Sequence, residues 1–82
     1  MNEFIREFNN EQLRQWINLN LHFGEEYSHL FVMNHINGES FLNLKLSDLK
    51  EMGIKIVGHR LNFFGLIRSE RKKLNLPTEQ NF

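Results

Sequence analysis

Histidines are the first residues to consider for chemistry, because imidazole is a common metal ligand and acid–base catalyst near neutral pH. The chain of 82 residues has four of them, His22, His29, His35 and His59. A metal-binding helix would place two histidines four residues apart, and no pair has that spacing. No cysteine is present to complete a zinc site. We therefore expect scattered, solvated or capping histidines, with no bound metal and no cofactor.

Catalytic patterns are also missing from the sequence. It contains no glycine-rich phosphate loop, no nucleophile elbow and no carboxylate pair placed in an evident cleft. A helical bundle of this size rarely encloses a substrate pocket. We predict that the chain has no catalytic residues and is not an enzyme.

Composition favours one small folded domain, since 40% of the residues are hydrophobic and 24% are charged. No apolar run approaches the roughly 20 residues that cross a bilayer, and no signal-peptide pattern follows Met1. The lack of cysteine suits a reducing compartment, so we expect a cytoplasmic protein, with the nucleus as the alternative. Residues 1–53 carry a net charge of −4 and residues 54–82 a net charge of +4, which would allow faces of opposite sign to attract each other between molecules.

Hydrophobic spacing predicts an all-α fold, a compact five-helix bundle with a long C-terminal helix. Asn9 or Asn10 is expected to cap the first helix and Ser47 the fourth, with Gly53 ending the fourth and Gly58 opening the fifth. Asn37-Gly38 is expected to form a turn. The helices are expected near residues 11–19, 25–34, 39–44, 48–52 and 59–74.

The apolar helical faces predict the buried core. We expect its main members to be Trp16, Phe31, Leu49, Phe64 and Ile67. Ile54 and Val57 are also expected to point inward.

The segment between Gly53 and Gly58 predicts an exposed corner at the start of the last helix. Ile56 and Leu61 fall off the expected core positions, so we expect both to face solvent. Isolated apolar residues are ordinary on protein surfaces, whereas an apolar pair rimmed by charge suits a binding interface. The expected rim consists of Lys55, His59 and Arg60.

Short motifs occur in a fixed order along residues 10–70. They are Trp16, Tyr27, Phe31, Ile36-Asn37-Gly38, Phe41-Leu42, Leu46-Ser47-Asp48-Leu49, Gly53-Ile54 and Gly58-His59-Arg60. Each is weak alone, but together their order and spacing resemble the sterile alpha motif (SAM) domain. The departures are Asn37, where that family usually has an acid, and Asn62, where a base often follows the Gly-His-Arg step.

The resemblance implies a five-helix bundle and, most often, protein–protein association. In many members the start of the fifth helix, the end-helix surface, docks on a mid-loop surface formed by the middle helices of another domain. The end-helix residues here would be Lys55, Ile56, His59, Arg60 and Leu61. A second candidate, the mid-loop surface, would be formed by Asn37, Glu39, Asp48 and Glu51.

These features predict a signalling or regulatory interaction module whose partner is another SAM-type domain or an acidic protein surface. We favour hetero-association over polymerisation, because Asn37 removes an acid and two lysines dilute the mid-loop surface. Binding of an RNA hairpin is the alternative function, disfavoured by sparse basic residues and zero net charge. No membrane partner is expected. The predicted boundaries are an N-terminal extension (1–8), an interaction domain (9–74) and a C-terminal tail (75–82).

Overall fold

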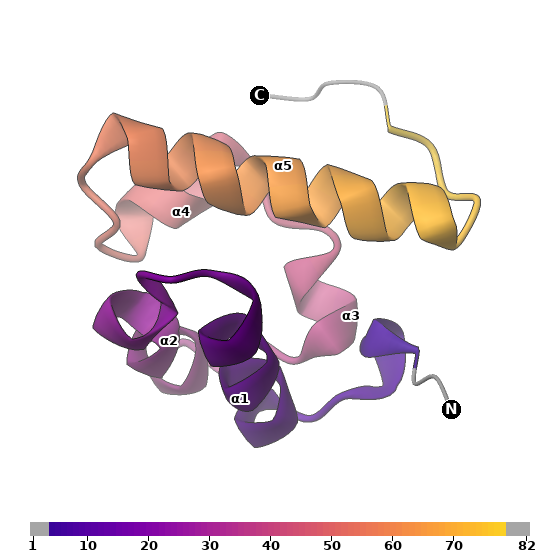
Figure 1. Cartoon of the computed structure of the whole chain (residues 1–82), viewed down its shortest axis with the longest axis horizontal. Helices are drawn as coiled ribbons and strands as arrows, with labels where there is room; N and C mark the ends of the chain where they lie inside the picture. The colour runs from indigo at the N-terminus through magenta and orange to yellow at the C-terminus, as the bar shows by residue number, and fades with distance from the viewer. Residues whose placement is uncertain (1–3, 79–82) are drawn as a thin grey trace. The chain divides into compact units, whose positions relative to one another are not determined.

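The structure is a computed structural model of the chain, and it describes residues 4–78 (Figure 1). Within that range the chain is all helical, which confirms the all-α class and the five α-helices, the last of them the longest. A short 3₁₀ helix, η1, precedes them. The elements are η1 (Ile5–Glu7), α1 (Asn10–Asn20), α2 (Gly24–Met33), α3 (Gly38–Phe41), α4 (Leu46–Glu51) and α5 (Val57–Lys73).

Residues up to Phe41 form one compact unit, in which α1 packs on α2 and η1 packs on α3. Aromatic rings meet edge to face around Phe41: the ring centroid of Trp16 lies 5.8 Å from it and that of Phe31 lies 5.9 Å from it. Such contacts stabilise a small unit beyond simple burial. Its buried apolar residues are Ile5, Leu13, Ile17, Tyr27, Phe31 and Phe41.

Helix α1 begins with a capping box at Asn9, one of the two predicted caps. The Oδ1 atom of Asn9 accepts from the Gln12 amide at 2.8 Å, and the Asn9 amide donates to Gln12 Oε1 at 2.9 Å. Two backbone amides at the helix start are thereby paired.

The turn predicted at Asn37-Gly38 is wrong, because this dipeptide begins α3. Asn37 Oδ1 accepts from the Ser40 amide at 2.9 Å and so acts as the helix cap. The preceding turn lies at His35, which adopts a left-handed conformation with φ of 57°. There the amide of Ile36 donates to the Phe31 carbonyl, which closes the end of α2.

The N-terminal residues pack tightly on α3. The Gly38 amide donates to the Phe8 carbonyl at 2.9 Å, and Ile5 is buried. A Cβ atom at residue 38 would lie 1.7 Å from the Ile5 carbonyl oxygen, so only glycine fits this approach. Part of the predicted extension is thus held against the helices. The boundaries at residues 9 and 74 stay predictions. The outer ends of the predicted extension and tail, residues 1–3 and 79–82, lie outside the described range.

Residues from Leu42 onward form a second compact unit, in which α4 packs on α5. The expected Ser47 cap is wrong, since Ser47 lies inside α4. The carboxylate of Asp48 instead accepts from the Lys45 amide at 2.9 Å, at the helix start. A carboxylate there also suits the helix dipole. The buried apolar residues of this unit are Leu42, Leu49, Ile54, Phe63 and Ile67.

Gly53 ends α4 as predicted, with a positive φ of 112°. The Ile54 amide donates to the Leu49 carbonyl at 3.1 Å, and the Gly53 amide donates to the Lys50 carbonyl at 3.0 Å. This pair of hydrogen bonds is the Schellman motif, in which glycine avoids the steric penalty of the left-handed conformation. The motif turns Ile54 inward, where it is fully buried.

Three core predictions are corrected by the structure. Trp16 and Phe64 are only partly buried, and Phe63 is fully buried in place of Phe64. Val57, expected inside, is 58% exposed. Helix α5 begins at Val57, so Val57 lies on the helix rather than in the loop before it. Phe63 and Ile67, four residues apart, share the buried face, and Phe64 lies about 100° round the helix from Phe63.

Candidate functional site

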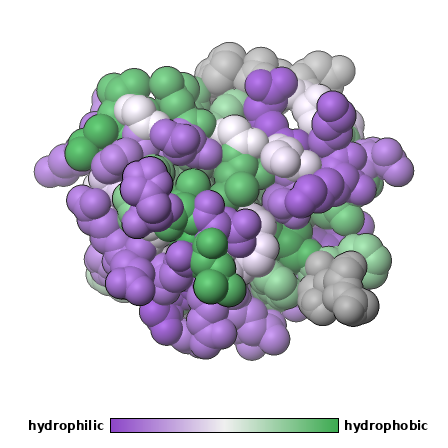
Figure 2. Space-filling model, viewed as in Figure 1, coloured by the Kyte–Doolittle hydropathy of each residue, from purple (hydrophilic) through white to green (hydrophobic). Residues whose placement is uncertain are grey.

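An apolar corner lies where α5 begins. Ile56 precedes the helix and is 53% exposed, Val57 is its first residue and is 58% exposed, and Leu61 is 54% exposed. Val57 and Leu61 are four residues apart and therefore lie on one side of the helix. Figure 2 shows a hydrophobic area over the end of the molecule where α5 starts. We call Ile56, Val57 and Leu61 the end-helix corner.

Val57 is the site residue that sequence reasoning missed. It was expected in the loop between Gly53 and Gly58, pointing into the core. With Val57 at the first helical position, its four-residue spacing from Leu61 is the signal that would have revealed it. The exposure predicted for Ile56 and Leu61 agrees with the structure.

Arg60 does more than border the corner. Its Nη1 atom donates to the Ile54 carbonyl at 2.8 Å and to the Lys55 carbonyl at 3.1 Å. The guanidinium therefore ties the loop before α5 to the first turn of the helix. Ile56 is the last residue of this loop and Val57 is the first residue of the helix. The hydrogen bonds of Arg60 therefore help to hold both apolar side chains in position without a partner.

The electrostatic setting of the corner is positive. No acidic residue lies in the first turn of α5, and the amide groups at a helix start carry partial positive charge. Lys55 is exposed next to the corner, and His59 is partly buried within the first turn. An apolar centre with a cationic border is suited to a partner with an apolar and acidic surface.

The predicted mid-loop residues fall in both compact units. In the N-terminal unit, Asn37 caps α3, and the carboxylate of Glu39 lies 3.8 Å from Arg6 Nε. In the C-terminal unit, Asp48 caps α4, and Glu51 is exposed at its last turn. Three of the four side chains thus have partners within their own unit.

Residues 4–78 show neither a metal site nor a membrane-spanning helix. No three histidine or acidic side chains of this range come together as a metal site would require. None of the helices in the same range has the length and apolar character to cross a bilayer.

Comparison with known proteins finds relatives among fungal proteins. It is 42% identical over 57 residues to the mitogen-activated protein kinase adapter protein MST50 of Pyricularia oryzae, which covers 70% of this chain and 12% of that protein. It is 50% identical over 48 residues to the mitogen-activated protein kinase kinase kinase MST11 of the same fungus, covering 58% of this chain and 5% of that protein. It is 34% identical over 71 residues to the sexual differentiation protein ste4 of Schizosaccharomyces pombe, covering 87% of this chain and 26% of that protein.

The chain therefore matches only a small part, about a quarter or less, of each of these relatives. A family model described as SAM domain (Sterile alpha motif) matches residues 6–69, most of the chain. The match includes α1 to α4 and all of the end-helix corner. The chain belongs to the sterile alpha motif family of helical interaction domains.

Proposed function

We propose that the chain is a protein–protein interaction module that binds a partner SAM-type domain through the end-helix corner. The observation that carries the proposal is the exposure of Ile56, Val57 and Leu61, each more than half exposed at one helix start. Burying such a cluster against a partner is favourable because it removes apolar surface from water. The hydrogen bonds of Arg60 preorganise the loop, which lowers the entropy lost on binding.

The relatives support a role in signalling. One is by name an adapter for a mitogen-activated protein kinase, and another is by name a mitogen-activated protein kinase kinase kinase. We propose that this chain likewise serves as a scaffold element that brings a cascade component to its parent protein. We propose the cytoplasm as its location, on the ground that the sequence has no cysteine.

Hetero-association fits the charges better than polymerisation does. Self-association would need an acidic surface to receive the end-helix corner. Asp48 is committed to the start of α4 and Glu39 is paired with Arg6, so two of the three acids of the predicted mid-loop surface already have intramolecular partners. The acidic surface is therefore expected on a different protein.

RNA binding is the weaker alternative for the same fold. Phosphate contacts require several available cations, and several of the arginines, Arg14 and Arg60 among them, are engaged within the chain. Arg14 Nε donates to Glu11 at 3.0 Å, and this pairing lowers the pKa of the Glu11 carboxyl and raises the pKa of Arg14. Arg60 donates to two backbone carbonyls.

Truncating Leu61 to alanine is expected to weaken binding by about tenfold or more, as removal of a buried anchor does. The assay is isothermal titration of the purified chain with the matching regions of MST50 and MST11. Leu19→Ala is the matched control, because Leu19 is 85% exposed and lies on α1, away from the corner in sequence and in a different unit. Its affinity is expected to equal that of the unchanged chain.

Two outcomes would contradict the proposal. Equal losses for the Leu61 and Leu19 variants would remove the end-helix corner as the interface. Binding to neither region, together with tight, hairpin-specific RNA binding at physiological salt, would replace the protein-binding assignment with the RNA alternative.

A further inference from the structure

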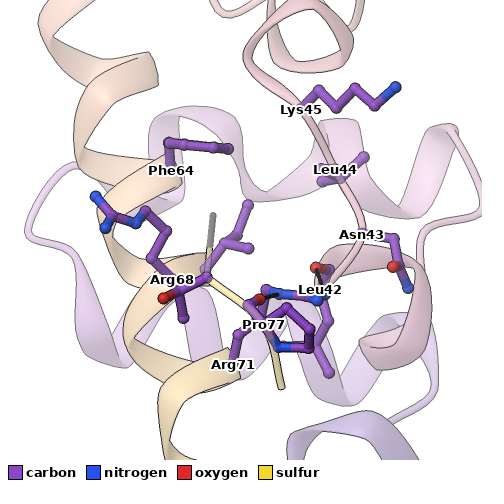
Figure 3. Close-up of a pocket in the computed structure, with 10 residues that line it drawn as sticks. Leu42, Asn43, Leu44, Lys45, Phe64, Arg68, Arg71 and Pro77 are labelled. Carbon is purple, nitrogen blue, oxygen red and sulfur yellow. Dashed lines mark hydrogen bonds between the residues drawn. The ribbon is translucent and has the colours of Figure 1, made fainter. Parts of the chain in front are cut away.

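A cavity of about 220 Å³ lies in the C-terminal unit, separate from the end-helix corner. One wall is the middle and later part of α5, a second is the segment before α4, and a third is the chain just after α5 (Figure 3). Leu42 and Ile67 are buried at its base, and Leu44 and Phe64 are partly exposed in it. In Figure 3 the ring of Phe64 points across the cavity toward Leu44. We call this cavity the Arg71 pocket.

Arg71 holds the pocket together. Its Nη1 atom donates to the Leu42 carbonyl at 2.9 Å, and its Nε atom donates to the Pro77 carbonyl at 2.6 Å. The chain beyond α5 turns back at Asn75, which adopts a left-handed conformation with φ of 60°. The Leu76 amide then donates to the Arg71 carbonyl at 2.9 Å. One arginine thus joins two walls of the pocket to the helix that forms the third.

The charges around the pocket have one sign. Lys45, Arg68 and Arg71 line it, and no acidic side chain does so within the described residues. In Figure 3 the charged ends of Lys45 and Arg68 lie at the rim rather than in the middle of the cavity. The pocket therefore combines an apolar base with a cationic rim, and a binding partner should be apolar at its centre and acidic at its edges.

We propose that the Arg71 pocket is a second docking site, which accepts a bulky apolar side chain flanked by acidic residues in a peptide of a partner protein. The volume suits one such side chain, since a cavity of about 150 Å³ already holds a benzene ring. A peptide fits the pocket better than a nucleic acid does, because only one of the five apolar lining residues, Phe64, is aromatic. Bases prefer aromatic side chains on which to stack.

The pocket lies apart from the end-helix corner along α5. The corner occupies the first turn and a half of the helix, whereas the pocket is lined from Phe64 onward. The two surfaces share no residue, so a scaffold of this kind can hold a SAM-type partner at one and a peptide at the other. The proposal stands independently of the function assigned to the corner.

The test is an amide chemical-shift titration of the isotope-labelled chain with a short, blocked peptide that has one leucine flanked by glutamates. Shifts are expected at residues 42–45 and 64–71. Arg68→Glu is expected to weaken binding by about tenfold, because it replaces an attraction with a repulsion. Lys50→Glu, at an exposed position on α4 outside the pocket lining, changes the net charge equally and is expected to change the affinity by less than about twofold. Both side chains are exposed, so both variants should fold.

Several results would overturn the proposal. The first is no binding of the peptide at millimolar concentration, and the second is equal losses for Arg68→Glu and Lys50→Glu, which would indicate non-specific attraction. A peptide with alanine in place of leucine that binds equally well would remove the apolar role of the pocket. Tighter binding of a uridine oligonucleotide at the same residues would assign the pocket to nucleic acid instead.

Discussion

Replacing Phe63 with alanine is expected to lower the free energy of unfolding by about 3–5 kcal/mol. The side chain is completely buried on the face of α5 that also carries Ile67. Its removal takes away the apolar transfer free energy and leaves a cavity that surrounding atoms fill only in part. Small domains have total stabilities of about 5–15 kcal/mol, so the variant should be largely unfolded at moderate temperature. Urea denaturation followed by circular dichroism measures the change.

Phe64→Ala is the matched control, because it removes the same group one residue along the helix. Phe64 is only partly buried, at the Arg71 pocket, so its loss is expected to cost less than half as much. A larger loss at Phe64 than at Phe63 would show that the buried face of α5 has been assigned wrongly.

Replacing Gly38 with alanine is expected to destabilise the N-terminal unit by about 3 kcal/mol, the upper range for overpacking. The added Cβ would lie 1.7 Å from the Ile5 carbonyl oxygen and 2.8 Å from its carbon. Both atoms belong to the backbone, so no side-chain rotation relieves the overlap. The segment of η1 must move away, which weakens the hydrogen bond from Gly38 to Phe8 and exposes Ile5.

Gly65→Ala provides the contrast for this prediction. Gly65 is exposed inside α5, and nothing lies within 4 Å of the position of an added Cβ. Alanine there is expected to stabilise the chain by up to about 1 kcal/mol, because glycine loses more backbone entropy in a helix. Thermal melts of the two variants should therefore shift in opposite directions. A melt of the Gly38 variant at or above that of the unchanged chain would disprove the close packing of η1 on α3.

Helix existence and several helix ends were predictable because their signals are local. Asn9 with Gln12 forms a capping box within four residues, and Gly53 supplies the positive φ that ends α4. Such signals depend on side chains that reach their own backbone, so the order of residues is enough to reveal them.

The buried face of α5 was harder to predict, because Phe63 and Phe64 are equally apolar neighbours whose side chains point about 100° apart round the helix. The apolar stripe included both of them, and placing the helix start at Gly58 left Val57 in the loop, where it was expected to point inward. The structure starts the helix at Val57, which is exposed, and buries Phe63. Glycine has no side chain whose burial could have signalled the correct start.

At the candidate sites, too, local features were predictable from the sequence and contacts between distant residues were not. The exposure of Ile56 and Leu61 followed from the spacing of apolar residues, whereas the bonds from Arg60 to two carbonyls did not. The Arg71 pocket was beyond the sequence analysis, because it depends on a hydrogen bond between Arg71 and Leu42, which are 29 residues apart. The Leu42 carbonyl comes within reach of Arg71 only in the folded chain, so no local sequence signal reveals this contact.

The central claim, that the end-helix corner binds a partner protein, is tested most directly by mapping the interface in solution. The measurement is an amide chemical-shift and cross-saturation experiment on the labelled chain, with the unlabelled matching region of MST11 as partner. The account predicts that the strongest effects fall on residues 55–61, centred on Ile56, Val57 and Leu61, and that they diminish as ionic strength rises. Effects confined to residues outside α5 and its preceding loop, with residues 55–61 unchanged, would contradict it.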